Sequence, residues 1–374
     1  VMAAVALVAI ILNRPAITLR ALATAALIIL LLRPESLMHV GFQMSFAATT
    51  GIVAGYELVR KQGWSQWLRG GGRWRVIGGY VAGLAGTSLV AGLATAPFSA
   101  FHFNQMAHYG LIANLAAVPV MGFWVAPAGL LAAFLAPFGA EGPALAIMGA
   151  GIDVILAISG GVAGLDGSAR LLAAGPDIAL TLIVAGGLVL ALLRSRVRIA
   201  GGGLVVAGLV VWLVVDTRPT LLVADGAGLM GLQTADGRAL DHKSAQNYAA
   251  KQWLRRDGDG ADQPTASERG GFIRNGAIVE ARLSNGWRVM STQGKRVDLS
   301  DLEALCQEKV LLMSRRAPAP LAGECTMFHG AALARMGALA IEMNGEKITV
   351  TTVSETAGRR RWTGYGPGGR PLTK

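Results

Sequence analysis

Apolar stretches of membrane-spanning length constrain this chain more than any other feature of its sequence. Residues 1–216 hold only 7 acidic and 12 basic side chains, whereas residues 217–374 hold 16 acidic and 22 basic ones. A helix needs about 20 predominantly apolar residues to cross the hydrocarbon core of a bilayer. The sequence therefore predicts a membrane part followed by a water-facing part.

Eight segments of the membrane part are candidate spans, and several are short or interrupted by glycine and proline. They are residues 1–12, 17–32, 37–59, 76–96, 111–135, 144–165, 176–193 and 199–215. Val1 begins inside an apolar run, so we expect the first span to continue upstream. Gly79 and Gly83, four residues apart, predict a close helix–helix contact. Pro119 predicts an interruption of the fifth span.

The distribution of Lys and Arg predicts the orientation, because cytoplasmic loops carry an excess of both. Ten of the twelve basic residues of the membrane part lie near residues 14–20, 60–75 and 194–198. Placing these three loops in the cytoplasm satisfies the alternation of spans. Arg33, Arg170 and the segment 97–110 then lie outside, and so does everything that follows the last span.

The water-facing part predicts a mixed α/β domain over residues 217–358. The expected helices are residues 246–256 and a segment from residue 299 with Ser300 as its N-cap. Residues 257–271 read as a polar loop. The expected strands are residues 220–225, 229–234, 238–242, 277–283, 286–291, 309–314, 338–343 and 346–353, with a hairpin turn at Asn285-Gly286. Residues 359–374 read as a basic flexible tail.

Polar side chains at membrane depth need a partner, and each is a candidate for a transport pathway or for a structural contact between helices. Gln43 and Ser45 lie in the third segment and point to different helix faces. Asn114 and Asp153 lie in later spans. The aromatic segment 97–110 adds Asn104, Gln105 and His108, and we expect it to lie at the interface or to re-enter the membrane.

Two sequence runs give these polar residues a context. The first contains Gly41, Phe42, Gln43, Ser45 and Phe46, and the second runs from Thr95 through HYGLIANLAAVP to Pro127. These two runs, occurring in this order, resemble the competence domain of the ComEC family. The resemblance covers roughly residues 1–215. The resemblance implies an inner-membrane channel that imports single-stranded DNA during natural transformation. It also implies a cytoplasmic DNA-translocating motor and a periplasmic DNA receptor as partners.

The resemblance extends to the opening of a metallo-β-lactamase-like domain, at Asp225, Gly226 and Gly237. Such a domain uses an H-x-H-x-D-H cluster to bind metal, and no such cluster occurs here: the water-facing part has only His242 and His329. We therefore expect a degenerate domain with no metal, no cofactor and no catalytic activity. Cys306 and Cys325 lie in this domain; outside the cytoplasm a disulfide between them is favoured over two free thiols.

The expected fold class is thus a polytopic α-helical membrane bundle (residues 1–216) followed by a small mixed α/β extracytoplasmic domain. The candidate channel or gating residues are Arg33, Gln43, Ser45, Asn104, Gln105, His108, Asn114 and Asp153. No P-loop of the form G-x-x-x-x-G-K-[ST] occurs, so ATP hydrolysis would belong to a partner. The alternatives are a small-molecule transporter with a periplasmic accessory domain and a membrane-anchored hydrolase.

Overall fold

The computed structural model describes most of the chain. The described residues are 7, 10, 11, 18–61, 73–193, 195–284, 286–292, 297–315, 317, 325–344 and 347–358. Most of the predicted span 1–12, Asn285 of the predicted turn and the tail 359–374 lie outside this set. The chain forms two compact units, residues 1–171 with 175–216, and residues 172–174 with 217–374.

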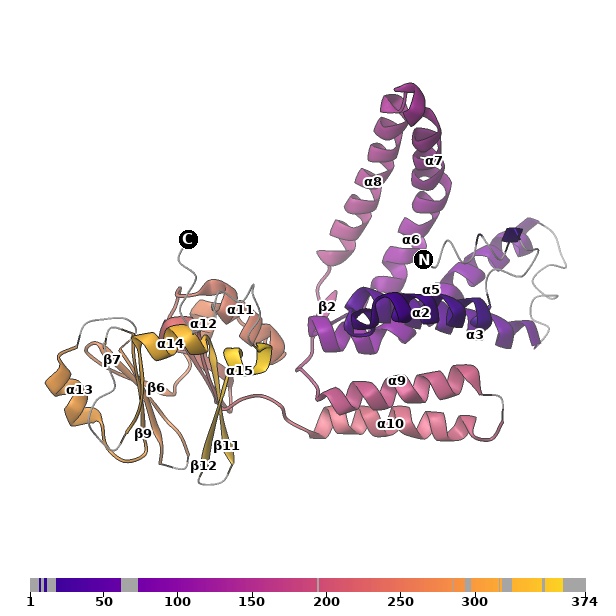
Figure 1. Cartoon of the computed structure of the whole chain (residues 1–374). Helices are drawn as coiled ribbons and strands as arrows, with labels where there is room; N and C mark the ends of the chain where they lie inside the picture. Colours follow the sequence, from indigo (N-terminus) through magenta and orange to yellow (C-terminus); the bar gives the residue numbers. More distant parts are fainter. Residues whose placement is uncertain are drawn as a thin grey trace. The chain divides into compact units, whose positions relative to one another are not determined.

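The first unit is built from helices (Figure 1). In chain order they are α2 (Leu19–Leu32), the 3-10 turn η1 (Pro34–Met38), α3 (Val40–Lys61), α5 (Arg73–Phe103), α6 (Gly110–Val120), the π-helical η2 (Met121–Val125), α7 (Ala126–Leu135), the 3-10 turn η3 (Ala136–Phe138), α8 (Gly142–Ala163), α9 (Asp177–Leu192) and α10 (Arg198–Val214). These helices confirm the mostly helical first part. Two short strands, β1 (Gln105–Ala107) and β2 (Ala169–Leu171), form an antiparallel pair that the sequence did not predict.

Among the described residues, three helical stretches are long and apolar enough to cross a membrane: Trp74–Phe103, Gly110–Phe138 and Gly142–Ala163. Helices α2, α9 and α10 are shorter but also apolar. Helix α5 runs past its predicted end, through Pro97, to Phe103. Residues 97–103 are therefore helical and continue the fourth predicted span, because an apolar helix tolerates the loss of the one hydrogen bond that proline removes. The interfacial or re-entrant placement of residues 97–110 stays a prediction.

Glycines set the closest helix contacts, but not those that the sequence predicts. Helices α9 and α10 cross where a β-carbon at Gly186 would lie 2.6 Å from the carbonyl oxygen of Gly201. Helix α3 meets α5 where a β-carbon at Gly51 would lie 3.0 Å from the Ala94 side chain. A β-carbon at Gly83 would meet nothing within 4 Å among the described residues. A close contact at Gly83 is therefore not found.

Pro119 does not end the fifth span. The helix continues from α6 through η2 into α7, and the π-helical turn begins two residues after the proline. Trp124 lies in this turn, and its indole N–H donates to the Ile147 carbonyl of α8 at 2.9 Å. The π turn therefore directs a side chain that joins two apolar helices.

The second unit contains two five-stranded sheets, which confirms the mixed α/β prediction. The first has the order β12-β11-β3-β4-β5, all antiparallel neighbours, and the second has the order β10-β9-β8-β7-β6, with β8, β9 and β10 parallel. The strands are β3 (Leu221–Val223), β4 (Met230–Thr234), β5 (Gly237–Leu240), β6 (Phe272–Asn275), β7 (Ile278–Arg282), β8 (Arg288–Ser291), β9 (Val310–Ser314), β10 (Thr326–His329), β11 (Leu339–Asn344) and β12 (Lys347–Thr352).

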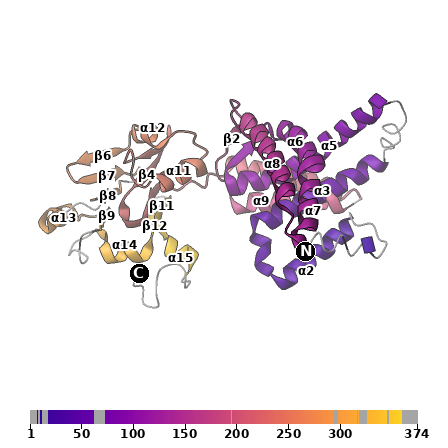
Figure 2. The same ribbon diagram turned by 90° about the horizontal axis from the view of Figure 1, so that it is seen from above.

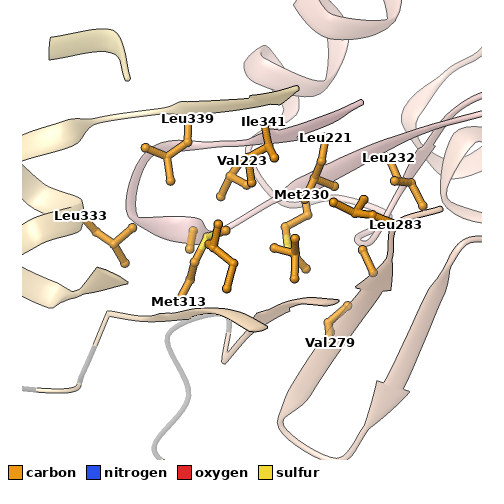
Figure 3. Packing of buried hydrophobic residues seen from close by; sticks show 14 residues of the cluster. Leu221, Val223, Met230, Leu232, Val279, Leu283, Met313, Leu333, Leu339 and Ile341 are labelled. Carbon is orange, nitrogen blue, oxygen red and sulfur yellow. The ribbon is translucent and has the colours of Figure 1, made fainter. Parts of the chain in front are cut away.

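Both sheets contribute to one apolar core (Figure 3). Leu221, Val223 and Met230 of the first sheet pack in the same cluster as Val279 and Met313 of the second, and all five are buried. Burial of this apolar surface is the main force that holds the two sheets together.

Helices cover the outer faces of both sheets (Figures 1 and 2). Helices α11 (Asn247–Arg256) and α12 (Gln263–Ser267) pack on the first sheet through Ala250, Leu254 and Ala266. Helix α13 (Leu299–Leu305) packs on the second sheet through Leu302. The layer order is therefore helix, sheet, sheet, helix. This unit also contains the 3-10 turn η4 (Asp225–Ala227) and the helices α14 (Gly330–Met336) and α15 (Val353–Ala357).

Three local predictions in this unit change. Asp298, not Ser300, is the residue before α13, so the predicted cap is wrong. The polar loop 257–271 contains the helix α12, which Asp262 caps by accepting from Thr265 N at 3.0 Å. The hairpin β6–β7 turns at Gly276 and Ala277, directly after Asn275, and the sequence did not predict this turn.

A disulfide joins α13 to the strand β10. Cys306 and Cys325 are bonded, with their α-carbons 4.8 Å apart. Cys306 is buried and Cys325 is half-buried beside Leu302 and Val310. The bond therefore fixes the helix layer of the second sheet to that sheet.

Candidate functional site

Gln43 connects three elements of the first unit. Its Oε1 lies 2.7 Å from His102 Nε2 near the end of α5, where the ring N–H donates. Its Nε2 donates to the Leu37 carbonyl of η1 at 3.0 Å. Both ends of one amide are thus used, which fixes the side chain and holds η1, α3 and α5 together.

The end of α5 carries a second group of polar atoms. Asn104 has a positive φ of 53°, and its N–H donates to the Ala100 carbonyl, so it ends the helix. The Asn104 Nδ2 is buried and has no hydrogen-bond partner among the described residues. Ser99 Oγ donates to the Gln105 carbonyl at 3.1 Å. Since buried donors are nearly always satisfied, the unmet amide marks a place where another polar group fits.

The β1–β2 pair continues directly from this helix end. Gln105 lies opposite Leu171, and Met106 opposite Arg170. His108 Nδ1 lies 3.0 Å from the Gly167 carbonyl, and the His108 N–H donates to the Ser168 carbonyl. We call the set Gln43, His102, Asn104, Gln105 and His108 the polar junction.

The structure does not bring every predicted residue to the polar junction. Three of them are exposed, and no hydrogen bond or ion pair among the described residues joins them to it: Arg33 at the end of α2, Asn114 on α6 and Asp153 on α8. Ser45 is exposed on another face of α3 than Gln43, as its spacing predicts. The sequence reading missed His102 as a member and missed β2 altogether. His102 lies in the same aromatic segment as Asn104, but its partner Gln43 is 59 residues away.

A buried arginine organises the second unit. Arg238 of β5 is fully buried, and its Nε donates to Asp257 Oδ2 at 2.5 Å, its Nη2 to Asp257 Oδ1 at 3.2 Å. Its remaining hydrogen bonds go to the carbonyls of Gly231 and Pro219. This one side chain therefore joins β4, β5, the segment before β3 and the end of α11.

A second ion pair lies beside it. Arg269 donates to both carboxylate oxygens of Asp259 and to the Arg238 carbonyl. Burial raises the pKa of the Asp259 carboxyl, but the hydrogen bonds from Arg269 and Ala261 outweigh this, so the pKa lies below its ordinary value. The pair stabilises the folded domain above the ordinary carboxyl pKa of about 3.9, and this contribution is lost as the pH falls through the lowered value.

The tripeptide Leu172–Ala174, which follows β2, belongs to the second unit. The Ala174 N–H donates to the Arg256 carbonyl at 2.8 Å, and Thr217 Oγ1 donates to the Ala174 carbonyl at 2.9 Å. Gly258 has a φ of 75°, and a β-carbon there would lie 2.6 Å from Ala173 N. Only glycine fits both the backbone conformation and this close approach.

The histidines of the second unit do not gather into a metal site. No group of three His, Cys, Asp or Glu side chains in the described part of the chain has the geometry to hold a metal ion. The His242 carbonyl accepts from Gln263 Nε2 at 3.0 Å. His329 precedes α14, and its Nδ1 is buried without a partner in the described structure.

Comparison with known proteins bears on the first unit. The family model described as Competence protein matches residues 1–197, which include all helices from α2 to α9 and the whole polar junction. No curated protein and no solved structure matches the chain. The matched region is more than half of the 374 residues. On this match the chain belongs to the competence protein family.

Proposed function

We propose that the chain is a component of an inner-membrane channel that imports single-stranded DNA during natural transformation. The observation that carries this proposal is the polar junction, which gathers amide and imidazole groups at the end of the longest apolar helix of a competence-family chain. A phosphate backbone cannot enter hydrocarbon, so an import path must be lined by groups that form hydrogen bonds.

The hydrogen bonds are consistent with the proposed orientation. The start of α3 and the end of α5, which Gln43 and His102 join, both lie outside when the basic loops are cytoplasmic. The same holds for β1 and for β2 with Arg170, which form a pair. Leu172–Ala174 come directly after β2 and are part of the second unit. The second unit is therefore also placed outside. This agreement supports one common side for these segments, and the basic loops, taken as cytoplasmic, make that side the periplasm.

The proposed channel role implies two partners. Single-stranded DNA would be delivered by a periplasmic DNA receptor and drawn inward by a cytoplasmic DNA-translocating motor. The chain itself would provide the path.

Replacing His108 or Asn114 with alanine should lower DNA uptake roughly threefold to tenfold, the range expected when one polar contact to a moving ligand is lost. The measurement is the transformation frequency in a competent host, with the amount of protein in the membrane fraction determined in parallel. Thr87→Ala is the matched control, because the Thr87 hydroxyl bonds only carbonyls of its own helix. Unchanged frequencies for both variants would reject these residues as channel groups, and a small-molecule transporter would become the better reading.

We further propose that the second unit is not a hydrolase. The purified full chain should bind no stoichiometric zinc, as measured by elemental analysis, and should leave single-stranded and duplex DNA intact, because His242 and His329 do not form part of a ligand group. Stoichiometric zinc together with metal-dependent cleavage would restore the membrane-anchored hydrolase.

A further inference from the structure

Helix α11 has an apolar face that is fully used inside the second unit. Ala250 and Leu254 are buried against Leu229 and Leu240. Trp253 is half-buried over β4, where its ring would lie 3.0 Å from a β-carbon at Gly231. This apolar face packs α11 onto the first sheet, and the exposed side chains of the opposite face take no part in that packing.

The opposite face has an unusual composition. Tyr248, Lys251, Gln252, Arg255 and Arg256 recur at spacings of three and four and so share one side of the helix. Tyr248 is 80% exposed, and Lys251 and Arg256 are exposed. No acidic residue occurs within α11, and the next two, Asp257 and Asp259, are held by Arg238 and Arg269.

We propose that this outer face of α11 is a binding surface for single-stranded DNA. The inference rests on the proposed function and adds to it the place where the strand is held before it reaches the polar junction. Lys251 and Arg256 would contact phosphates, and Tyr248 would stack on a base. Exposed aromatic rings between cations are the common means of holding single strands without sequence preference.

The position of the helix along the chain suits this role. The Arg256 carbonyl accepts from Ala174, which follows the strand β2 by three residues. The glycine contact between Gly258 and Ala173 reinforces the same attachment. A DNA strand bound to α11 would thus be connected, through the chain segment Leu172–Ala174, to the β1–β2 pair.

A bilayer surface is the competing partner for a basic helix. An amphipathic helix binds at a membrane interface by inserting its apolar face between the lipids. In α11 that face is covered by the sheet, and the free face offers one tyrosine among polar side chains. This composition fits a hydrated polyanion with flat bases better than it fits lipid.

The test is the affinity of the full chain, in nanodiscs of zwitterionic phosphatidylcholine, for a fluorescent 20-nucleotide oligothymidine, measured by anisotropy across a salt series. The variant Lys251→Gln/Arg256→Gln should bind about tenfold more weakly, and the slope of log affinity against log salt should fall by about 1.4, or roughly 0.7 for each lost phosphate contact. Tyr248→Ala should bind about tenfold more weakly, while Tyr248→Phe should stay near the wild-type affinity, because the ring is retained.

The matched control removes the same two charges elsewhere. Arg335 of α14 and Lys347 of β12 are exposed, and Arg335→Gln/Lys347→Gln should change the affinity less than twofold. Equal affinities and salt slopes for the two double variants would overturn the DNA surface, as expected if the face instead binds anionic headgroups. Transformation separates the two proposals: a wild-type chain that supports no DNA uptake rejects the channel, whereas uptake with unchanged oligonucleotide affinity of the α11 variants rejects only this surface.

Discussion

Replacing Asp257 with alanine should destabilise the second unit by roughly 3–5 kcal/mol, the usual cost of leaving one member of a buried ion pair without its partner. Arg238 is fully buried, and Asp257 accepts two of its hydrogen bonds. Because both side chains are buried, water can replace the lost carboxylate only if the end of α11 moves away from β5. The measurement is urea-dependent pulse proteolysis of the full chain in detergent, which reports unfolding of this unit.

Two further variants separate the ion pair from a general effect of substitution. Asp298→Ala should change the stability by less than about 0.5 kcal/mol, because the Asp298 side chain makes no capping hydrogen bond and is exposed. Arg238→Met/Asp257→Leu should recover part of the loss, since no charge is then buried alone. Recovery would stay incomplete, because the Gly231 and Pro219 carbonyls lose their donor. A full loss in Asp298→Ala, or none in Asp257→Ala, would contradict the organising role of Arg238.

Gln43→Leu should reduce DNA uptake by about thirtyfold or more, which corresponds to about 2 kcal/mol. Leucine preserves the size of the side chain but leaves the His102 ring N–H and the Leu37 carbonyl without a partner. The contact between η1, α3 and α5 is then lost at the polar junction. Transformation frequency, corrected for protein in the membrane fraction, is the measurement.

A double-mutant cycle makes this prediction specific. His102→Phe should lower uptake by a similar factor, and Gln43→Leu/His102→Phe should be no worse than either alone, because both changes remove the same hydrogen bond. Thr49→Ala is the control on α3, since its hydroxyl donates to the Ser45 carbonyl of the same helix. Multiplicative effects in the double variant would show that the two residues act separately.

The helices and most strands were predictable because their signals are local. Apolar runs give the spans, and alternating residues between glycine turns give strands such as β4 and β7. The strands β1 and β2 have three residues each, and their paired residues are more than 60 positions apart in the sequence. No periodic pattern therefore predicts them. The extension of α5 to Phe103 was not predicted, because Pro97 usually ends a helix in water. In an apolar helix, proline is tolerated.

The candidate site was predictable in part for the same reason. Gln43, Asn104, Gln105 and His108 stand out as polar residues in apolar surroundings, which a sequence shows directly. Their grouping depends on how α3 meets α5, and Gly51, which the sequence did not single out, lies at that contact. The sequence predicted a helix at residues 246–256, but which of its side chains are exposed depends on the side that Leu254 buries.

The chain passes between the two units three times, on both sides of Leu172–Ala174 and after residue 216. After a protease cut near residue 216, residues 217–374 would keep only noncovalent contacts with Leu172–Ala174, among them the hydrogen bonds of Ala174 with Arg256 and Thr217. A chain that starts at residue 217 would instead present the backbone around Gly258 uncovered. The boundary between the two units is thus a property of the three-dimensional fold and cannot be drawn at one point of the sequence.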